Sequence, residues 1–268
     1  MIKAKIICNW AVLPEFYFDV PVELYIDQYP KTPKPKGLVR FCLSHEPHPL
    51  VAARAFFHPE YYDYLLTWKT EHLLDIPHAR FFHAFDNRCG DYVPRVKEFA
   101  VSTVVGEKNE FVGHHMRQML YLRQNEITIP KKFYLSGNKK WADIKYTDQP
   151  LLDFNTKDAL WNTQFHIAIE NLFPDNWFTE KLIDCFLTDT VPVYIGPPNI
   201  ENYFNMDGII LCKNIEEIIE KCNALTPETY DTMKVAMQDN KERTPYWTSM
   251  PAKIEREITA ILQDRAEL

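Results

Sequence analysis

Glycine is scarce in this sequence, with 7 among 268 residues. No two glycines are separated by one residue or by four, so neither GxGxxG nor GxxxxGK occurs. The glycine-rich loops that usually hold phosphate groups are therefore excluded. If the chain binds a nucleotide, other elements must hold it.

The sequence also lacks an excess of positive charge. It has 30 basic and 37 acidic residues, which give a formal net charge of −7 and a pI of about 5.7. A duplex nucleic acid requires a net basic surface, so this class of partner is excluded. A small anionic ligand that contacts one or two local cations is not excluded.

Features of secreted and membrane proteins are missing as well. The six cysteines form no CxxC pair, and there is no N-x-S/T sequon. The opening MIKAKIICNW has no basic region followed by a long apolar run, and no stretch approaches about 18 consecutive apolar residues. We therefore expect buried free thiols, no integral membrane segment and a cytoplasmic protein.

What the sequence does contain is a regular alternation of strand-like and helix-like segments. The expected strands include Phe165–Ile169, Val191–Ile195 and 208–211, and the expected helices include 50–57, Thr156 to Trp161 and about Phe178 to Thr188. The pattern breaks around 86–94, which holds Asn87, Gly90 and Pro94. We predict an N-terminal α/β domain over 1–93 and a C-terminal α/β domain over 94–268. Alternation of this kind is typical of parallel, doubly wound sheets, and ligands of such sheets bind at the carboxyl ends of the strands. Two such Rossmann-like domains would face each other across a cleft.

The segment from Phe165 to Phe204 carries the most information. A buried strand ends at Glu170-Asn171, a loop follows, and a helix opens with Thr179-Glu180-Lys181. A helix start offers backbone N–H groups and a positive dipole end, which suit a diphosphate. Lys181 adds a positive charge, and Glu180 could accept hydrogen bonds from ribose or sugar hydroxyls. The alternative is that Thr179-Glu180 caps the helix and Lys181 is solvated.

Three parts of this segment resemble the C-terminal motif of glycosyltransferase family 10, the α-1,3/α-1,4-fucosyltransferases. They are Phe165 to Asn171, Trp177 to Asp184 and Val191 to Gly196. The resemblance implies a GT-B-like fold and inverting transfer of a sugar, usually L-fucose from GDP-fucose, to a glycan hydroxyl. It also implies that 1–93 is the acceptor-side domain and 94–268 the Rossmann-like domain that binds the nucleotide-sugar donor. Such a reaction needs a base for the acceptor and cations for the departing diphosphate.

The resemblance also implies roles for individual residues. Glu46, in Ser44-His45-Glu46-Pro47 after a buried strand, is the candidate base; otherwise it is a solvated loop glutamate. Arg117, in a helix that follows a strand, is the second cation, since its planar fork can bind two phosphate oxygens. Otherwise it is a surface arginine, and Lys108 could share its role. The implied donor-binding residues are Arg117, Asn171, Trp177, Glu180 and Lys181.

Two positions depart from the family pattern: Trp177 replaces the usual Tyr, and Leu172 replaces Ser or Thr. Another GDP- or UDP-sugar donor, or a catalytically silent nucleotide- or carbohydrate-binding protein, is therefore an alternative.

No D-x-D pair occurs, and the HExH spacing at His45 does not place two histidines on one helical face. We expect no obligate metal cofactor, although a divalent ion could assist. The chain resembles a compact microbial or viral form without the anchor and stem of the animal enzymes.

Overall fold

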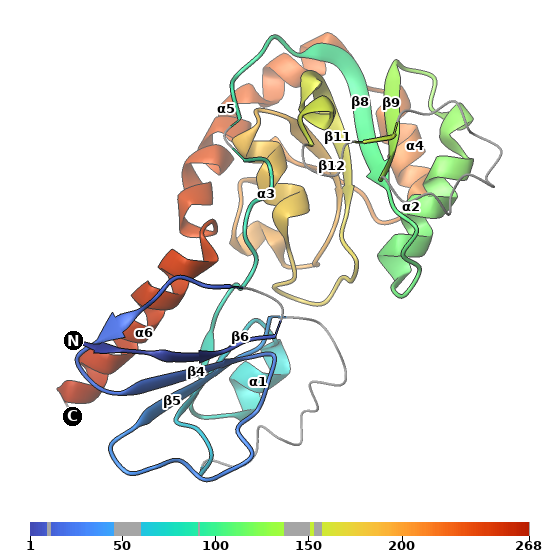
Figure 1. Cartoon of the computed structure of the whole chain (residues 1–268). Coiled ribbons are helices and arrows are strands. Elements are labelled where there is room, and N and C mark those ends of the chain that lie inside the picture. The colour runs from blue at the N-terminus through green and yellow to red at the C-terminus, as the bar shows by residue number, and fades with distance from the viewer. Residues whose placement is uncertain (10–11, 46–59, 91, 137–150, 153–156, 268) are drawn as a thin grey trace. The chain divides into compact units, whose positions relative to one another are not determined.

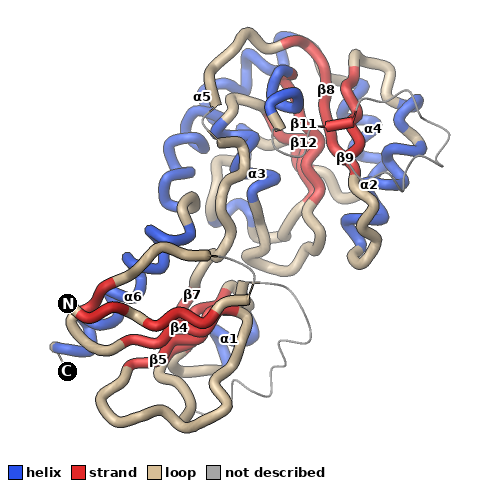
Figure 2. The backbone as a smooth tube through the Cα atoms, viewed as in Figure 1, coloured by secondary structure: helices blue, strands red, loops and turns tan. Residues whose placement is uncertain are grey.

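The computed structural model describes residues 1–9, 12–45, 60–90, 92–136, 151–152 and 157–267 (Figure 1). The chain forms two compact units. Unit 1 comprises Met1–Phe85 together with Ser249–Leu268, and unit 2 comprises Asp86–Thr248. Each unit is built around its own parallel sheet, shown in red in Figure 2.

The sheet of unit 1 has the strand order β2-β4-β5-β6-β7, and every pair in it is parallel. All five residues of β5 are buried, as expected for an inner strand of a parallel sheet that is covered on both faces. A short antiparallel pair, β1 with β3, and one helix, α1, complete this part of the chain. The elements are β1 (Ile2–Lys3), β2 (Lys5–Ile7), β3 (Tyr17–Phe18), β4 (Val22–Ile26), β5 (Val39–Leu43), β6 (Tyr64–Thr67), α1 (Thr70–Asp75) and β7 (Ala79–Phe81).

The closing helix α6 (Met250–Ala266) belongs to unit 1. Its buried residues Met250, Ile254 and Ile258 lie in one apolar cluster with residues of β4 and β5. The unit boundary lies at Phe85–Asp86 and the chain returns to unit 1 at Ser249, whereas the sequence predicts one boundary at 93–94. The difference arises because burial of the apolar face of α6, which is distant in sequence from its partners, determines where this helix packs.

The sheet of unit 2 has the order β10-β9-β8-β11-β12-β13, and every pair in it is parallel. Numbered from its first strand, this order is 3-2-1-4-5-6, which is the Rossmann arrangement. Its strands are β8 (Glu98–Val105), β9 (Lys131–Ser136), β10 (Leu151–Leu152), β11 (Thr163–Ile169), β12 (Val191–Ile195) and β13 (Ile210–Leu211).

Helices cover both faces of this sheet. In Figure 1, α2 and α4 lie on one side of the strands and α3 and α5 on the other, and the helices of each pair contact each other. The doubly wound α/β arrangement predicted from the sequence is thus confirmed for unit 2. The helices are α2 (Val112–Leu122), α3 (Glu180–Leu187), α4 (Ile215–Asn223) and α5 (Pro227–Arg243).

Several local predictions differ from the structure in detail. The helix predicted from Thr156 to Trp161 is a short 3-10 helix at Asp158–Asn162. The strand predicted over 208–211 is reduced to Ile210–Leu211, because a 3-10 turn at Met206–Gly208 precedes it. The helix predicted over 50–57 lies outside the described residues. Within the described ranges, no helix has the length and apolar character needed to cross a membrane.

Candidate functional site

The candidate site lies where the strand order of unit 2 reverses. The chain runs outward from β8 to β10 on one side, and from β11 to β13 on the other. The helices that follow β8 and β11 therefore leave the sheet on opposite faces, which opens a crevice at the carboxyl ends of these two strands. The end of β11 leads directly into Glu170-Asn171, and α2 follows β8. This position is where ligands of open α/β sheets bind.

The first turn of α2 comes very close to the end of β11 at Gly113. The Gly113 N–H donates to the Asn171 carbonyl oxygen at 3.0 Å. A Cβ atom on Gly113 would lie 1.7 Å from the Glu170 carbonyl oxygen and 2.9 Å from the Asn171 Cα atom. Only glycine fits at this contact, because the neighbouring atoms belong to the backbone.

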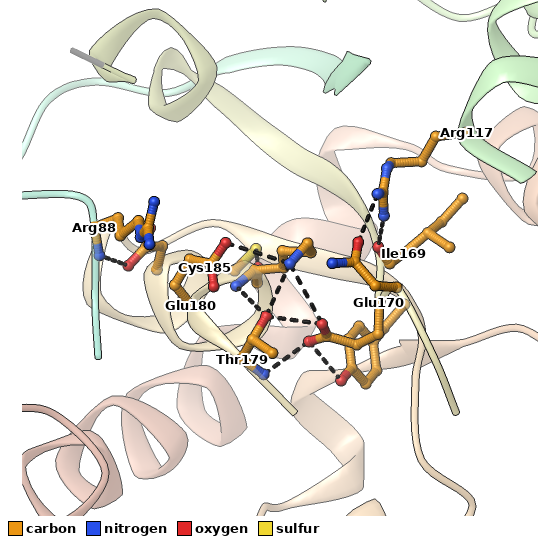
Figure 3. A network of polar contacts seen from close by, with 11 residues as sticks. Arg88, Arg117, Ile169, Glu170, Thr179, Glu180 and Cys185 are labelled. Atoms are coloured by element: carbon orange, nitrogen blue, oxygen red, sulfur yellow. Dashed lines mark hydrogen bonds and ion pairs between the residues drawn. The ribbon is translucent and has the colours of Figure 1, made fainter. Parts of the chain in front are cut away.

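Arg117, one turn further along α2, is fixed to the same end of β11. One terminal nitrogen of its guanidinium donates to the Ile169 carbonyl oxygen, and the other donates to Asn171 Oδ1 at 2.7 Å (Figure 3). Burial lowers the pKa of Arg117 to about 10, so the guanidinium is still positive at neutral pH. The structure thus brings together two predicted donor-binding residues, Arg117 and Asn171.

On the other side of β11, the start of α3 is held by Glu170, whose side chain is fully buried. Glu170 Oε1 accepts the Thr179 N–H at 2.8 Å, and Glu170 Oε2 accepts the Thr179 hydroxyl at 2.7 Å. The Tyr194 hydroxyl, from β12, donates to Glu170 Oε1 at 3.2 Å. Figure 3 shows Glu170 and Thr179 facing each other through these contacts.

Lys181 points back onto this buried carboxylate. Its Nζ donates to Thr179 Oγ1 at 3.1 Å, and it lies 3.3 Å from Glu180 Oε1 and 3.6 Å from Glu170 Oε2. The side chain is 22% exposed. Lys181 is thus held by an acidic residue on each side and is not simply solvated.

The sequence left open the alternative that Thr179 and Glu180 merely cap α3, and this alternative holds in part. Thr179 is the N-cap of α3, and its hydroxyl oxygen accepts the Lys181 N–H at 3.4 Å. The Glu170 carboxylate also lies at this helix start, where the helix dipole favours a negative charge. Acceptors from the chain itself thus bind the N–H groups of Thr179 and Lys181, at the helix start that the sequence suggests for a diphosphate. The group that this helix start presents is the Lys181 ammonium.

Positive charge dominates the electrostatics of this site. Burial raises the pKa of Glu180, but Lys181, Lys157 and Arg88 together lower it to about 2. Burial, followed by the charges of Arg117, Lys108 and Lys181, lowers the pKa of His114 to about 4. The groups whose pKa is shifted are Glu180 and His114, and the cations that shift it are Arg88, Lys108, Arg117, Lys157 and Lys181.

His114 is neutral at pH 7, because its pKa is about 4. His114 Nδ1 accepts the Phe111 N–H at 3.2 Å, so the neutral ring carries its proton on Nε2. Among the residues that the structure describes, no group of three or more His, Cys, Asp or Glu side chains could hold a metal ion.

Three further residues were predicted from the sequence: Glu46, Trp177 and Lys108. Glu46, the predicted base, lies outside the described residues. Trp177 lies in the loop that joins β11 to α3 and is buried, with 2% of its surface exposed. Lys108 is exposed, and its carbonyl oxygen accepts a hydrogen bond from Gln118.

Sequence reasoning did not assign a role to Gly113, Glu170 or Tyr194. Glu170 could have been found from its place at the end of a buried strand, beside Asn171. For Gly113, the scarcity of glycine was the available signal, and for Tyr194 it was its place in the motif from Val191 to Gly196.

Comparisons with known proteins show what this chain is similar to. Residues 142–226 match the family model described as "Glycosyltransferase family 10 (fucosyltransferase) C-term". This match includes Asn171, Trp177, Glu180 and Lys181, but neither Arg117 nor Glu46. An α-(1,3)-fucosyltransferase of Helicobacter pylori is 30% identical over 69 residues, which are 25% of this chain and 14% of that protein. The matched segments span 12% to 17% of the length of the first curated relatives.

Solved structures are similar over much more of the chain. An α1,3-fucosyltransferase with GDP has a TM-score of 0.52 at 16% identity, covering 81% of this chain and 69% of that one. TarM has a TM-score of 0.61 at 10% identity, covering 89% of this chain and 54% of that one. The solved structures thus confirm the GT-B-like fold with Rossmann-like α/β units, and the family match confirms the resemblance of this chain to glycosyltransferase family 10.

Proposed function

We propose that this chain is an inverting glycosyltransferase that transfers a sugar, L-fucose from GDP-fucose, to a hydroxyl group of a glycan acceptor. The family match over 142–226 and the likeness to an α1,3-fucosyltransferase that was solved with GDP-fucose support this proposal. The observation that carries it is the placement of two cations, Arg117 and Lys181. They come from the helices after β8 and β11 and contact the same strand end, at the reversal of the strand order.

Each residue of this proposed donor site has a chemical role. Arg117 and Lys181 neutralise the negative charge that develops on the diphosphate as its bond to the sugar breaks. The Glu180 carboxylate, kept ionised by its cationic neighbours, accepts hydrogen bonds from ribose or sugar hydroxyls. Asn171 retains its amide N–H donors, because its Oδ1 already binds Arg117. Buried Trp177 shapes the loop that carries these groups.

In the proposed reaction, Glu46 takes the proton of the acceptor hydroxyl. The hydroxyl oxygen then forms a bond to the anomeric carbon from the face opposite the leaving group, and the bond from that carbon to the diphosphate oxygen breaks. The electron pair stays on the nucleoside diphosphate. Two positively charged side chains at the diphosphate make its departure possible without an obligate metal ion.

The first test measures binding by calorimetry and thermal shift with GDP, UDP, GDP-fucose and GDP-mannose. We expect the GDP compounds to stabilise the protein, because a ligand that binds the folded state raises the melting temperature. Lys181→Ala should weaken GDP binding by about tenfold or more, since it removes a charge-assisted contact. Lys234→Ala is the matched control, because Lys234 lies on α5 and pairs with Asp231 in an exposed ion pair.

The second test separates binding from transfer. Glu46→Ala should retain GDP binding and lose nearly all transfer, whereas a solvated loop glutamate would leave both unchanged. No response to any nucleotide would contradict the proposed function and favour a protein that binds carbohydrate only. A preference for UDP would retain the transferase and change the donor.

A further inference from the structure

The fully buried carboxylate of Glu170 lies between three elements of unit 2. Glu170 follows β11, Thr179 begins α3, and Tyr194 lies in β12. Each of them contributes to one hydrogen-bond cluster, in which Thr179 and Tyr194 donate to the Glu170 carboxylate oxygens at 2.7–3.2 Å. The neighbouring Gly196 is needed for this arrangement, because a Cβ atom there would lie 2.2 Å from the Tyr194 hydroxyl oxygen.

The carboxylate is connected to Lys181 by two routes. One is direct, the 3.6 Å ion pair between Lys181 Nζ and Glu170 Oε2. The other passes through Thr179, whose hydroxyl donates to Glu170 Oε2 and accepts from Lys181 Nζ at 3.1 Å. A lysine side chain loses rotamer entropy when it is immobilised. These contacts hold the ammonium in place before any ligand arrives.

An ionised carboxylate at this position is costly for the fold. Burial raises the pKa of Glu170, in opposition to the nearby Lys181 and the Thr179 donors. A neutral side chain of the same shape would avoid the desolvation cost of the buried charge. Since the side chain has no exposed surface, it cannot touch a ligand.

We propose that Glu170 is a positioning residue, which fixes the Lys181 ammonium through Thr179 so that Lys181 is preorganised for the diphosphate of the donor. This inference rests on the proposed function, because the diphosphate is the ligand that Lys181 would bind. Preorganisation increases affinity by reducing the ordering that binding requires. Glu170 therefore supports ligand binding, and its buried charge lowers the stability of the fold.

The test is a double-mutant cycle with Glu170→Gln, Lys181→Ala and the double variant, with GDP binding measured by calorimetry. Glu170→Gln should weaken GDP binding by about tenfold in the wild-type background and by less than about twofold in the Lys181→Ala background. Chemical denaturation should show that Glu170→Gln is as stable as the wild type or more stable at pH 7. Tyr194→Phe is the control: it removes a donor from the same carboxylate without touching Lys181 or Thr179, and should change GDP binding by less than about twofold.

A second variant covers the case in which Glu170→Gln does not fold. Thr179→Val keeps the shape and the backbone N–H bond to Glu170, but removes the hydroxyl that connects Glu170 to Lys181. Because the same hydroxyl caps α3, this variant also loses stability, so its GDP binding is compared with and without Lys181. It should weaken GDP binding in the same direction, and its effect should likewise disappear in the Lys181→Ala background.

Three results would overturn the inference. The first is unchanged GDP binding in Glu170→Gln. The second is an equal loss of GDP binding on Glu170→Gln with and without Lys181. The third is a loss of GDP binding in Glu170→Gln that parallels a loss of its stability. Failure of the proposed function has a different signature, because the wild-type protein itself would then not bind GDP.

Discussion

The backbone N–H of Gly113 donates to the backbone carbonyl oxygen of Asn171 at 3.0 Å, and so joins the first turn of α2 to the end of β11. One turn later, Arg117 donates to the Asn171 side chain. The main chain and the side chain of one asparagine therefore both bind the same helix. The position of the Arg117 guanidinium depends on this contact, because a shift of α2 would move both groups together.

Gly113→Ala should destabilise the protein by about 2–3 kcal/mol, because the new methyl group would overlap backbone atoms of β11. Helix propensity alone predicts the opposite sign, a gain of up to about 1 kcal/mol. Urea unfolding measures the difference. Gly106→Ala is the control, since its Cβ atom would meet the movable Ser136 side chain and should cost less than about 1 kcal/mol. An increase in stability in Gly113→Ala would show that the close approach is not as tight as described.

Arg117→Lys should weaken GDP binding by about tenfold, although the positive charge is kept. The lysine cannot reproduce the fork that binds both the Ile169 carbonyl oxygen and Asn171 Oδ1. Calorimetry with GDP measures the change. Arg95→Lys is the control, because Arg95 forms an exposed ion pair with Asp158. Equal GDP binding in both variants and the wild type would remove the guanidinium geometry from the proposed donor site.

The buried His166 should make stability depend on pH below 6.5. Burial lowers its pKa from 6.5 to about 3. Between these values the unfolded chain binds a proton that the folded chain does not, so stability falls as the pH is lowered from 6.5. Each such histidine contributes about 1.4 kcal/mol per pH unit at most. In His166→Gln, urea unfolding from pH 7 to pH 4.5 should show a shallower fall than in the wild type.

His115→Gln is the control for this prediction, because His115 is exposed on α2. It should leave the wild-type slope unchanged. The prediction is wrong if His166→Gln and His115→Gln have the same pH dependence of the free energy of unfolding.

Asp184 should show the opposite dependence. It is buried in α3, where it accepts the Arg88 N–H at 2.8 Å, and burial raises its pKa from 3.8 to about 6. Between pH 3.8 and 6 the folded state binds more protons than the unfolded state, so the contribution of Asp184 to the free energy of unfolding falls as the pH rises. The stability of Asp184→Asn relative to the wild type should therefore be greater at pH 7 than at pH 4.5. A constant difference across this range would show that Asp184 does not titrate with a raised pKa.

Part of the candidate site could be predicted from the sequence because it is local. Glu170, Asn171, Glu180 and Lys181 lie within twelve residues, at a strand end and the following helix start. Hydrophobic runs of strand length and the scarcity of glycine indicated this unit and excluded a glycine-rich loop. The predicted boundaries of β11, α3 and β12 are accordingly close to those observed.

What could not be predicted depends on contacts between distant segments. Arg117 and Asn171 are far apart in the chain, and the hydrogen bond between them follows from the parallel pairing of β8 with β11. The assignment of α6 to unit 1 has the same origin, since its apolar face carries no information about which core it joins.

The amino-acid sequence by itself determined which elements form and which chemical groups stand at their ends, because helix and strand signals act over a few residues. The tertiary structure alone decided that acceptors of the chain itself bind the N–H groups of Thr179 and Lys181, and that the Lys181 ammonium lies at this helix start. A carboxylate from the preceding strand, brought there by sheet pairing, already occupies that helix start. Burial of that charge is a property of packing, and packing depends on the whole unit.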